Sequence, residues 1–240
     1  MLNIEIIPCL SDNYSYVIVD EETNLVGVID PSEFESINNF LSKKYKKLDY
    51  ILNTHHHFDH VNGNKELKLK YNSKIVASKI DREKIPGIDT LVDDQEIWMH
   101  ESFEAKVIHV PGHTLGHICF YFYKEESIFT GDTLFSLGCG RIFEGTYSQM
   151  FHSLKKLKKL PKNTKIFCGH EYTKLNSKFC MTNDKNNENL KAKINDMDMK
   201  IKNNLPTIPS TIKDELECNI FLRSNNMETF SKLRDLKDNF

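Results

Sequence analysis

The chain has 240 residues, of which 39% are hydrophobic and 28% are charged. This length suits one large domain or two small ones, each with a buried core. Lys and Arg number 32 against 34 Asp and Glu, so the formal net charge is -2, which argues against binding of nucleic acid through an excess of basic charge. The longest apolar run, 118–123, is far shorter than the ~18 residues that a membrane helix requires.

The N-terminal sequence and the cysteines give an expectation about compartment. The first ten residues contain no basic stretch and no apolar core of about 7–15 residues, so we expect no secretory signal. The six cysteines form no Cys-x-x-Cys pair, which argues against a zinc ribbon or a thioredoxin-like site. We therefore expect reduced, partly buried thiols in a cytoplasmic protein, with no membrane or nucleic-acid partner.

The first half of the chain predicts alternating strands and helices. Short apolar runs bounded by turn residues predict strands over residues 4–7, 16–19, 25–29, 49–53 and 74–77. Helical spacing predicts helices over residues 32–47 and 64–71, the first with Phe34, Ile37, Phe40 and Leu41 on one face.

The second half continues this pattern and then becomes helical. Strands are predicted over residues 104–110, 117–123, 127–130 and 164–168, and a helix over residues 149–160. This order predicts a layered α/β domain. Beyond about Thr173 we expect helices and no strand: one with an apolar stripe from Leu190 to Leu205, ended by Pro206, and a last one from Met227 to Leu236 with Asn225 as its N-cap.

Potential metal ligands crowd the segment that follows the strand over residues 49–53. The sequence Thr-His-His-His-Phe-Asp-His occupies residues 54–60. Neutral imidazole and carboxylate groups suit zinc, iron or manganese, and a loop can wrap them around one ion. A solvated His-rich turn is the alternative reading of this segment alone.

Three further ligand-type residues each follow a predicted strand. His113 lies in Val-Pro-Gly-His-Thr, Asp132 in Thr-Gly-Asp-Thr and His170 in Cys-Gly-His-Glu. A glycine beside each one lets the chain turn sharply. Four strand ends that carry ligand-type residues predict a metal site at one edge of the sheets.

The pattern His-x-His-x-Asp-His, followed in order by His, Asp and His, resembles the metallo-β-lactamase superfamily. Within it, the chain is similar to the glyoxalase II family of hydroxyacylglutathione hydrolases, and this similarity runs from end to end. It rests on the motifs THHHFDH (54–60), PGHT (111–114), GDTLF (131–135), GCGR (138–141), CGHEYT (168–173), FLR (221–223) and LRDLKDNF (233–240).

The resemblance implies a fold and an activity. The fold is α/β: a metallo-β-lactamase αββα sandwich over residues 1–173, which forms the dinuclear metal hydrolase domain, followed by a small helical glutathione-binding domain over residues 174–240. The implied reaction is hydrolysis of S-(2-hydroxyacyl)glutathione, chiefly S-D-lactoylglutathione, to glutathione and D-lactate. This is the second step of methylglyoxal detoxification. A monomer is expected.

By the same resemblance, seven side chains hold two divalent ions: His55, His57 and His113 hold the first, Asp59, His60 and His170 hold the second, and Asp132 bridges both. Zinc is the expected metal, with iron or manganese as alternatives. Asp59 and Asp132, together with a bridging hydroxide, are the expected catalytic groups. Bound metal lowers the pKa of water to about 7 and so supplies a nucleophile at neutral pH.

The sequence also gives expectations for two residues near the expected ligands, His56 and Asp30. His56 lies between two ligands, so an alternating chain points it away, and we interpret it as a non-ligand with a structural or supporting role. Asp30, at the end of a strand, matches the superfamily's acid that orients a ligand histidine. A turn-forming Asp before Pro31 is the alternative.

The family grips glutathione with basic and tyrosine residues, and the matching positions here are Arg141, Phe143, Tyr172, Arg234 and Lys237. Arg141 replaces the more usual Lys and keeps its charge. Phe143 replaces a frequent Tyr, which removes a hydrogen bond worth about 1 kcal/mol. Arg234 and Lys237 share a helix face, for which a solvated charged surface is the plain alternative.

Two other classes of function remain open. One is a different enzyme of the superfamily, such as a persulfide dioxygenase with one iron, a lactonase or a β-lactamase. The second-metal set of Asp59, His60 and His170 argues against a mononuclear enzyme. The other class is a non-catalytic metal-binding protein, against which the complete set of ligands argues. The fold alone does not decide function.

Overall fold

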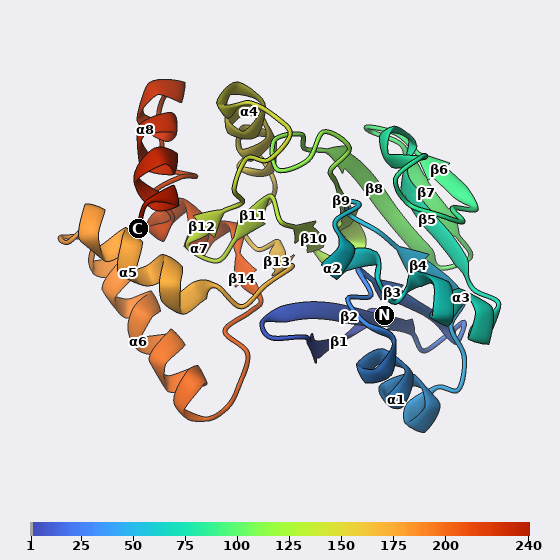
Figure 1. Cartoon of the computed structure of the whole chain (residues 1–240). Coiled ribbons are helices and arrows are strands. Elements are labelled where there is room, and N and C mark those ends of the chain that lie inside the picture. The colour runs from blue at the N-terminus through green and yellow to red at the C-terminus, as the bar shows by residue number, and fades with distance from the viewer. Residues whose placement is uncertain (1) are drawn as a thin grey trace. The chain divides into compact units, whose positions relative to one another are not determined.

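The computed structural model describes residues 2–240 (Figure 1), which fall into two compact units. Unit 1 contains the chain up to His109 together with residues 116–125, and unit 2 contains residues 110–115 and 126–240. The boundary predicted at residue 173 lies inside unit 2 and stays a prediction.

Unit 1 is built from two sets of strands and a few short helices. Six strands form one sheet in chain order: β1 (Leu2–Cys9), β2 (Asn13–Asp20), β3 (Leu25–Ile29), β4 (Tyr50–Leu52), β5 (Lys74–Ser78) and β6 (Thr90–Val92). β1 to β3 are antiparallel, and β3 to β6 run parallel. The second set, antiparallel, is β7 (Ile97–His100), β8 (Phe103–His109) and β9 (Ile118–Phe122). The α-helices are α1 (Phe34–Lys44), α2 (Phe58–Val61) and α3 (Asn64–Tyr71), and the short 3-10 helices are η1 (Lys79–Asp81) and η2 (Tyr123–Glu125).

The core of unit 1 lies on both faces of the six-stranded sheet. On one face, Ile37 and Leu41 of α1 and Leu67 of α3 pack into a buried aliphatic cluster with the strands. On the other face, Tyr50 of β4 meets Trp98 of β7 edge-to-face, with ring centroids 5.3 Å apart. Burial of apolar area on both faces explains why parallel strands here are almost wholly apolar.

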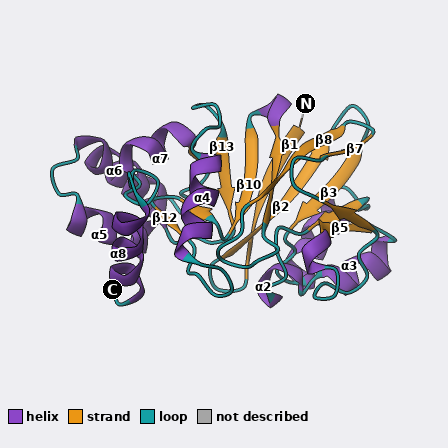
Figure 2. Ribbon diagram, turned by 90° about the horizontal axis from the view of Figure 1, so that it is seen from above, coloured by secondary structure: helices purple, strands orange, loops and turns teal. Residues whose placement is uncertain are grey.

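Unit 2 combines a short sheet with the C-terminal helices. Its strands are β10 (Ser127–Gly131), β11 (Leu134–Phe135), β12 (Gly138–Cys139), β13 (Lys165–Cys168) and β14 (Ser210–Thr211). β10 and β13 pair parallel, β13 and β14 pair antiparallel, and β11 and β12 form a hairpin. The helices are α4 (Tyr147–Leu157), α5 (Thr173–Asn183), α6 (Glu188–Lys202), α7 (Ile212–Cys218) and α8 (Met227–Asp238), of which α5 to α8 gather together in both views (Figures 1 and 2).

Aromatic side chains join the helices of unit 2. Phe151 of α4 lies 5.8 Å from Phe230 of α8, and Phe221 lies 6.1 Å from Phe230 and 5.8 Å from Phe179 of α5, measured between ring centroids. Each such pair adds about 0.5–1.5 kcal/mol beyond simple burial. The last helix is therefore packed on α4 and α5 rather than free in solvent.

Most of the predicted elements form, and the α/β expectation is confirmed. The exact matches are β3 and α3. Two predictions are wrong in detail. β14 is a strand after Cys168; only two residues long, it has too little sequence to show an alternating pattern. The N-cap of α8 is Asn226, whose Oδ1 accepts from the Thr229 N–H at 2.8 Å, and not Asn225.

The predicted apolar stripe of the long helix ends earlier than expected. Leu190 and Met197 are buried, but Leu205 lies beyond the end of α6 and is exposed. Strands β6 and β7 lie outside the predicted set because they are short and partly exposed. No helix formed by residues 2–240 is long and apolar enough to cross a membrane.

All six cysteines are buried, and none of them forms a disulfide among residues 2–240. Burial raises the pKa of Cys9 to about 11 and that of Cys168, Cys180 and Cys218 to about 12. Because the thiolate is the reactive form, we predict that none of the six reacts with a thiol reagent within minutes at pH 8 in the folded protein. In denaturant all six should react. A cysteine that is labelled rapidly in the native state would contradict this burial.

Candidate active site

The acidic residue Asp30 organises the ligand loop of unit 1. It follows β3, in a left-handed conformation with φ +48°, and is almost fully buried. Its Oδ1 accepts from the Thr54 N–H at 2.7 Å, and its Oδ2 accepts from the Thr54 hydroxyl at 2.6 Å. The parallel neighbours β3 and β4 thus end side by side, and the carboxylate of one fixes the loop that leaves the other.

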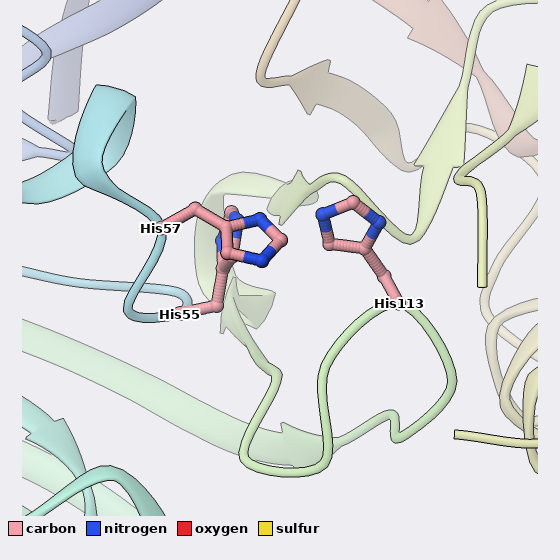
Figure 3. A group of neighbouring side chains, drawn as sticks. All are labelled: His55, His57 and His113. Atoms are coloured by element: carbon pink, nitrogen blue, oxygen red, sulfur yellow. The ribbon is translucent and has the colours of Figure 1, made fainter. Parts of the chain in front are cut away.

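His55 and His57 follow Thr54 on that loop. Their ring centroids lie 4.8 Å apart in an edge-to-face arrangement. Figure 3 labels both side chains and also His113, which belongs to the loop after β8. The Nδ1 of His55 lies 3.0 Å from the Thr54 Oγ1. Because that hydroxyl already gives its hydrogen to Asp30, Nδ1–H of His55 is the donor, and Nε2 is left as the atom that binds a metal.

Asp59 and His60 lie on α2, the short helix that His57 precedes. Asn13 at the start of β2 donates to the Oδ2 and to the main-chain oxygen of Asp59, at 3.0 and 3.1 Å. His60 is fully buried, and its Nδ1 lies 3.1 Å from the Oδ2 of Asp30. Asn13 thus positions Asp59, a candidate ligand 46 residues later in the chain. No local sequence pattern identifies Asn13 as such a partner.

In unit 2, His113 is held by the main chain of the Gly-Cys-Gly-Arg segment. Its Nδ1–H donates to the carbonyl oxygen of Arg141 at 2.7 Å. Gly112, just before it, has φ +151°, and a Cβ there would lie 2.7 Å from the Cβ of Met150 on α4. The glycine in the Pro-Gly-His-Thr motif is therefore required by the conformation and by the closeness of the helix.

Asp132 and His170 follow the paired strands β10 and β13. The Oδ2 of Asp132 lies 3.3 Å from the Nε2 of His170 and 3.4 Å from the Nε2 of His113. A Cβ on Gly140 would lie 1.9 Å from the main-chain oxygen of Asp132, so only glycine lets this segment approach so closely. Unit 2 thus brings together the three ligand-type residues predicted in it.

The donor atoms of each unit fit a cation. With Nδ1–H committed to a carbonyl oxygen, a neutral His113 turns the lone pair of Nε2 toward the carboxylate of Asp132. In unit 1, with Nδ1–H of His60 directed at Asp30, its Nε2 faces the Oδ2 of Asp59 at 3.7 Å. Two hydrogen-bond acceptors that face each other repel unless a proton or a cation lies between them, most strongly in the buried pair of His113 and Asp132 and less strongly at Asp59, whose side chain is 38% exposed. The chemistry of both sets therefore suits a divalent metal ion.

Asp30 and His56 are supports rather than ligands. Asp30 belongs geometrically to a group with His55 and His60 that could hold an ion, but its two oxygens already accept three hydrogen bonds, from Thr54 and His60. His56 turns to Asp81, a buried residue of η1, with 3.1 Å between its Nδ1 and the Oδ1 of Asp81. The sequence did not single out Asp81, which lies 25 residues away.

Two of the predicted substrate-binding residues lie against ligand histidines. The ring of Phe143 meets that of His113 edge-to-face at 5.2 Å, and the ring of Tyr172 stacks on that of His170 at 4.7 Å and 4°. Phe143 is 61% exposed. Both rings therefore pack against candidate ligand histidines, and the Phe143 ring is largely exposed.

The three basic candidates occupy different surroundings. Arg141 is exposed, whereas Arg234 is only 4% exposed, so the alternative of a solvated face does not hold for Arg234. One Nη of Arg234 donates to the Cys139 carbonyl at 2.8 Å and the other to Asp238 at 2.9 Å. Lys237 lies over Phe179 and Phe240. Burial, together with the charge of Arg234, lowers the pKa of Lys237.

We predict that Asp30→Asn weakens metal binding by about 10- to 100-fold, because the variant loses the charged partner of a ligand histidine. Metal content after dialysis against a graded chelator measures this. Asp49→Asn is the matched control, since Asp49 accepts from the Val26 N–H near the opposite end of β4. Equal metal retention by the two variants would contradict the role of Asp30, and thermal unfolding without metal separates it from a loss of fold.

Comparison with known proteins accounts for the whole chain. The metallo-β-lactamase superfamily model matches residues 10–170, and the model of the hydroxyacylglutathione hydrolase C-terminus matches residues 171–240. Hydroxyacylglutathione hydrolase of Pelagibacter ubique is 66% identical over 239 residues, covering all of both chains. The protein of that name from Rhodospirillum rubrum is 41% identical over 254 residues, covering 100% of this chain and 99% of its own.

Solved structures share the fold. BLEG-1 B3 metallo-β-lactamase has a TM-score of 0.73 at 21% identity and covers 92% of this chain and 100% of its own. The di-iron-bound form of TTHA1623 has a TM-score of 0.57 at 26% identity and covers 68% of this chain and 90% of its own. The αββα fold followed by a helical C-terminal region is confirmed. The chain belongs to the hydroxyacylglutathione hydrolase family within the metallo-β-lactamase superfamily.

Proposed function

We propose that this chain hydrolyses the thioester of S-(2-hydroxyacyl)glutathione, chiefly S-D-lactoylglutathione, to glutathione and D-lactate. The full-length similarity to hydroxyacylglutathione hydrolases supports the reaction. Within the molecule, the observation that carries the proposal is the facing of acceptor atoms in each unit, His60 toward Asp59 and His113 toward Asp132. This arrangement is suited to divalent ions, which would supply a nucleophilic water for the reaction.

We infer that the two ligand sets form one dinuclear centre. The first ion would be held by His55, His57 and His113, the second by Asp59, His60 and His170, and both by Asp132. The likeness to the family supports this division of the ligands. Zinc is the metal we propose, with iron or manganese as alternatives; the di-iron-bound relative in fold is consistent with the iron alternative.

When bound, divalent ions supply a water of lowered pKa, about 7, and stabilise negative charge on the reacting carbonyl oxygen. The chain's own groups prepare this chemistry. Asp59 and Asp132 would balance half of the positive charge of two divalent ions, and Asn13 keeps the carboxylate of Asp59 in place. Asp30, Thr54 and the Arg141 carbonyl fix the histidine tautomers, so no proton has to move before ligands bind.

Side chains of unit 2 would grip the glutathione moiety. Arg141, Phe143, Tyr172, Arg234 and Lys237 all belong to this unit. Arg141 is exposed and offers a planar guanidinium to a carboxylate, and Phe143 and Tyr172 present aromatic surface beside the ligand histidines. We propose residues 1–173 as the metal hydrolase domain and residues 174–240 as the helical domain that carries much of this specificity.

The six free thiols support a reducing compartment, and we propose that the enzyme works in the cytoplasm as a monomer. Because glutathione is abundant where thiols stay reduced, the proposed substrate is consistent with the proposed compartment.

We predict rapid hydrolysis of S-D-lactoylglutathione at neutral pH by protein that carries two ions per chain. The double variant Arg234→Ala/Lys237→Ala should raise KM about tenfold or more, because Lys237 would lose a charge-assisted contact with the substrate and Arg234→Ala would release Asp238 and the Cys139 carbonyl, which precedes Arg141 by two residues. Lys232→Ala is the control: Lys232 lies on the same helix but pairs with Glu228 in solvent. Absence of turnover with two ions bound would exclude this substrate, and lactones, β-lactams and persulfides would then be assayed.

A second prediction concerns Phe143. Phe143→Tyr adds a hydroxyl at an exposed position beside His113, and a new hydrogen bond of about 1 kcal/mol should lower KM by up to about fivefold. The value of kcat should change little, since the ring contact with His113 is retained. Steady-state kinetics measure both constants, and an unchanged or higher KM would show that a hydroxyl at residue 143 does not reach the substrate.

A further inference from the structure

The side chain of Asp238 lies between two of the basic residues that would bind the substrate. Its Oδ1 accepts from the Nη2 of Arg234 at 2.9 Å and from the Nε of Arg141 at 3.3 Å. Its main-chain oxygen also accepts from the Nη2 of Arg141 at 3.4 Å. Residue 238 therefore covers the Nε and Nη2 edge of Arg141 with two oxygen atoms, which is the pattern in which a guanidinium binds a carboxylate.

The two arginines differ in their freedom to move. Arg234 is buried, spans four residues of α8 to reach Asp238, and also holds the Cys139 carbonyl, so its contact with Asp238 is fixed. The side chain of Arg141 is 55% exposed, and its Nε lies 3.3 Å from the Oδ1 of Asp238. An exposed ion pair of this kind is worth about 0.2–1 kcal/mol. Arg141 can therefore leave Asp238 at small cost.

We propose that Asp238 is an internal carboxylate that occupies Arg141 in the resting enzyme and competes with the carboxylate of the glutathione thioester for this guanidinium. The inference rests on the proposed function. On binding, the substrate carboxylate takes the Nε and Nη2 edge of Arg141, and Asp238 stays on Arg234. Asp238 thereby sets the affinity for glutathione conjugates and also releases product glutathione more readily.

Competition by Asp238 lowers the apparent affinity for glutathione in proportion to the fraction of molecules in which Arg141 is free. Removing the competitor should therefore lower KM by about two- to fivefold, the range that corresponds to an exposed ion pair. A positioning role would act in the opposite direction, since loss of Asp238 would then disorder Arg141 and raise KM. The sign of the change separates the two roles.

The experiment compares Asp238→Asn with wild type in two assays: hydrolysis of S-D-lactoylglutathione, and calorimetric binding of glutathione and of glutathione whose glycine carboxylate is an amide. We expect KM and the glutathione Kd to fall about two- to fivefold, kcat to stay unchanged, and the amide to show no gain. In an Arg141→Ala background the effect of Asp238→Asn should vanish. Asp235→Asn is the matched control, because it removes the same charge from α8 but its carboxylate bonds Tyr147.

The outcomes distinguish the two proposals. A KM or Kd that rises or stays unchanged in Asp238→Asn, or a gain that persists in Arg141→Ala, overturns the competition. Wild type that carries two ions but leaves the thioester intact overturns the proposed function; tighter glutathione binding by Asp238→Asn would still support the role of Asp238. Failure of glutathione to bind either protein would overturn the role of Asp238, whereas the proposed function is decided by the hydrolysis assay alone.

Discussion

The candidate site depends on one constraint: in each unit, two hydrogen-bond acceptors face each other. His60 turns a lone pair toward Asp59, and His113 turns one toward Asp132. Such arrangements are unfavourable unless positive charge lies between the two acceptors, above all in the buried pair of His113 and Asp132. The surrounding polar groups take up the opposite ring nitrogens, so they hold the acceptors in place and leave a metal ion as the partner that resolves the repulsion.

That arrangement depends on unusual main-chain geometry near the ends of strands. Asp30 adopts a left-handed conformation after β3 and ties down Thr54 after β4, while Gly112 and Gly140 allow approaches that any side chain would block. Parallel neighbours are useful here because their carboxyl ends lie at one edge of a sheet. The stiff, buried strands supply position, and the loops supply chemistry.

The C-terminal helices serve a different purpose. They are fixed to the rest of unit 2 through aromatic packing of Phe151, Phe221 and Phe230 and through Asn219, which donates to the main chain of the β11–β12 hairpin. That hairpin leads into Arg141. The helical region and the segment that holds His113 are therefore one packed unit, which couples the proposed grip on glutathione to the position of a metal ligand.

The sequence by itself determined the family and most of the elements and predicted the ligand residues, because these depend on local spacing and on motifs such as THHHFDH and GCGR. It also placed His56 outside the ligand set. Only the tertiary structure decided which residues support the ligands: Asn13 and Asp81 act across 46 and 25 residues, and no local pattern encodes such contacts. It likewise decided that Arg234 is buried and that Asp238 lies on Arg141. The surroundings of a charged side chain are set by packing between helix and loop, whereas helix periodicity alone gives only the face on which it lies.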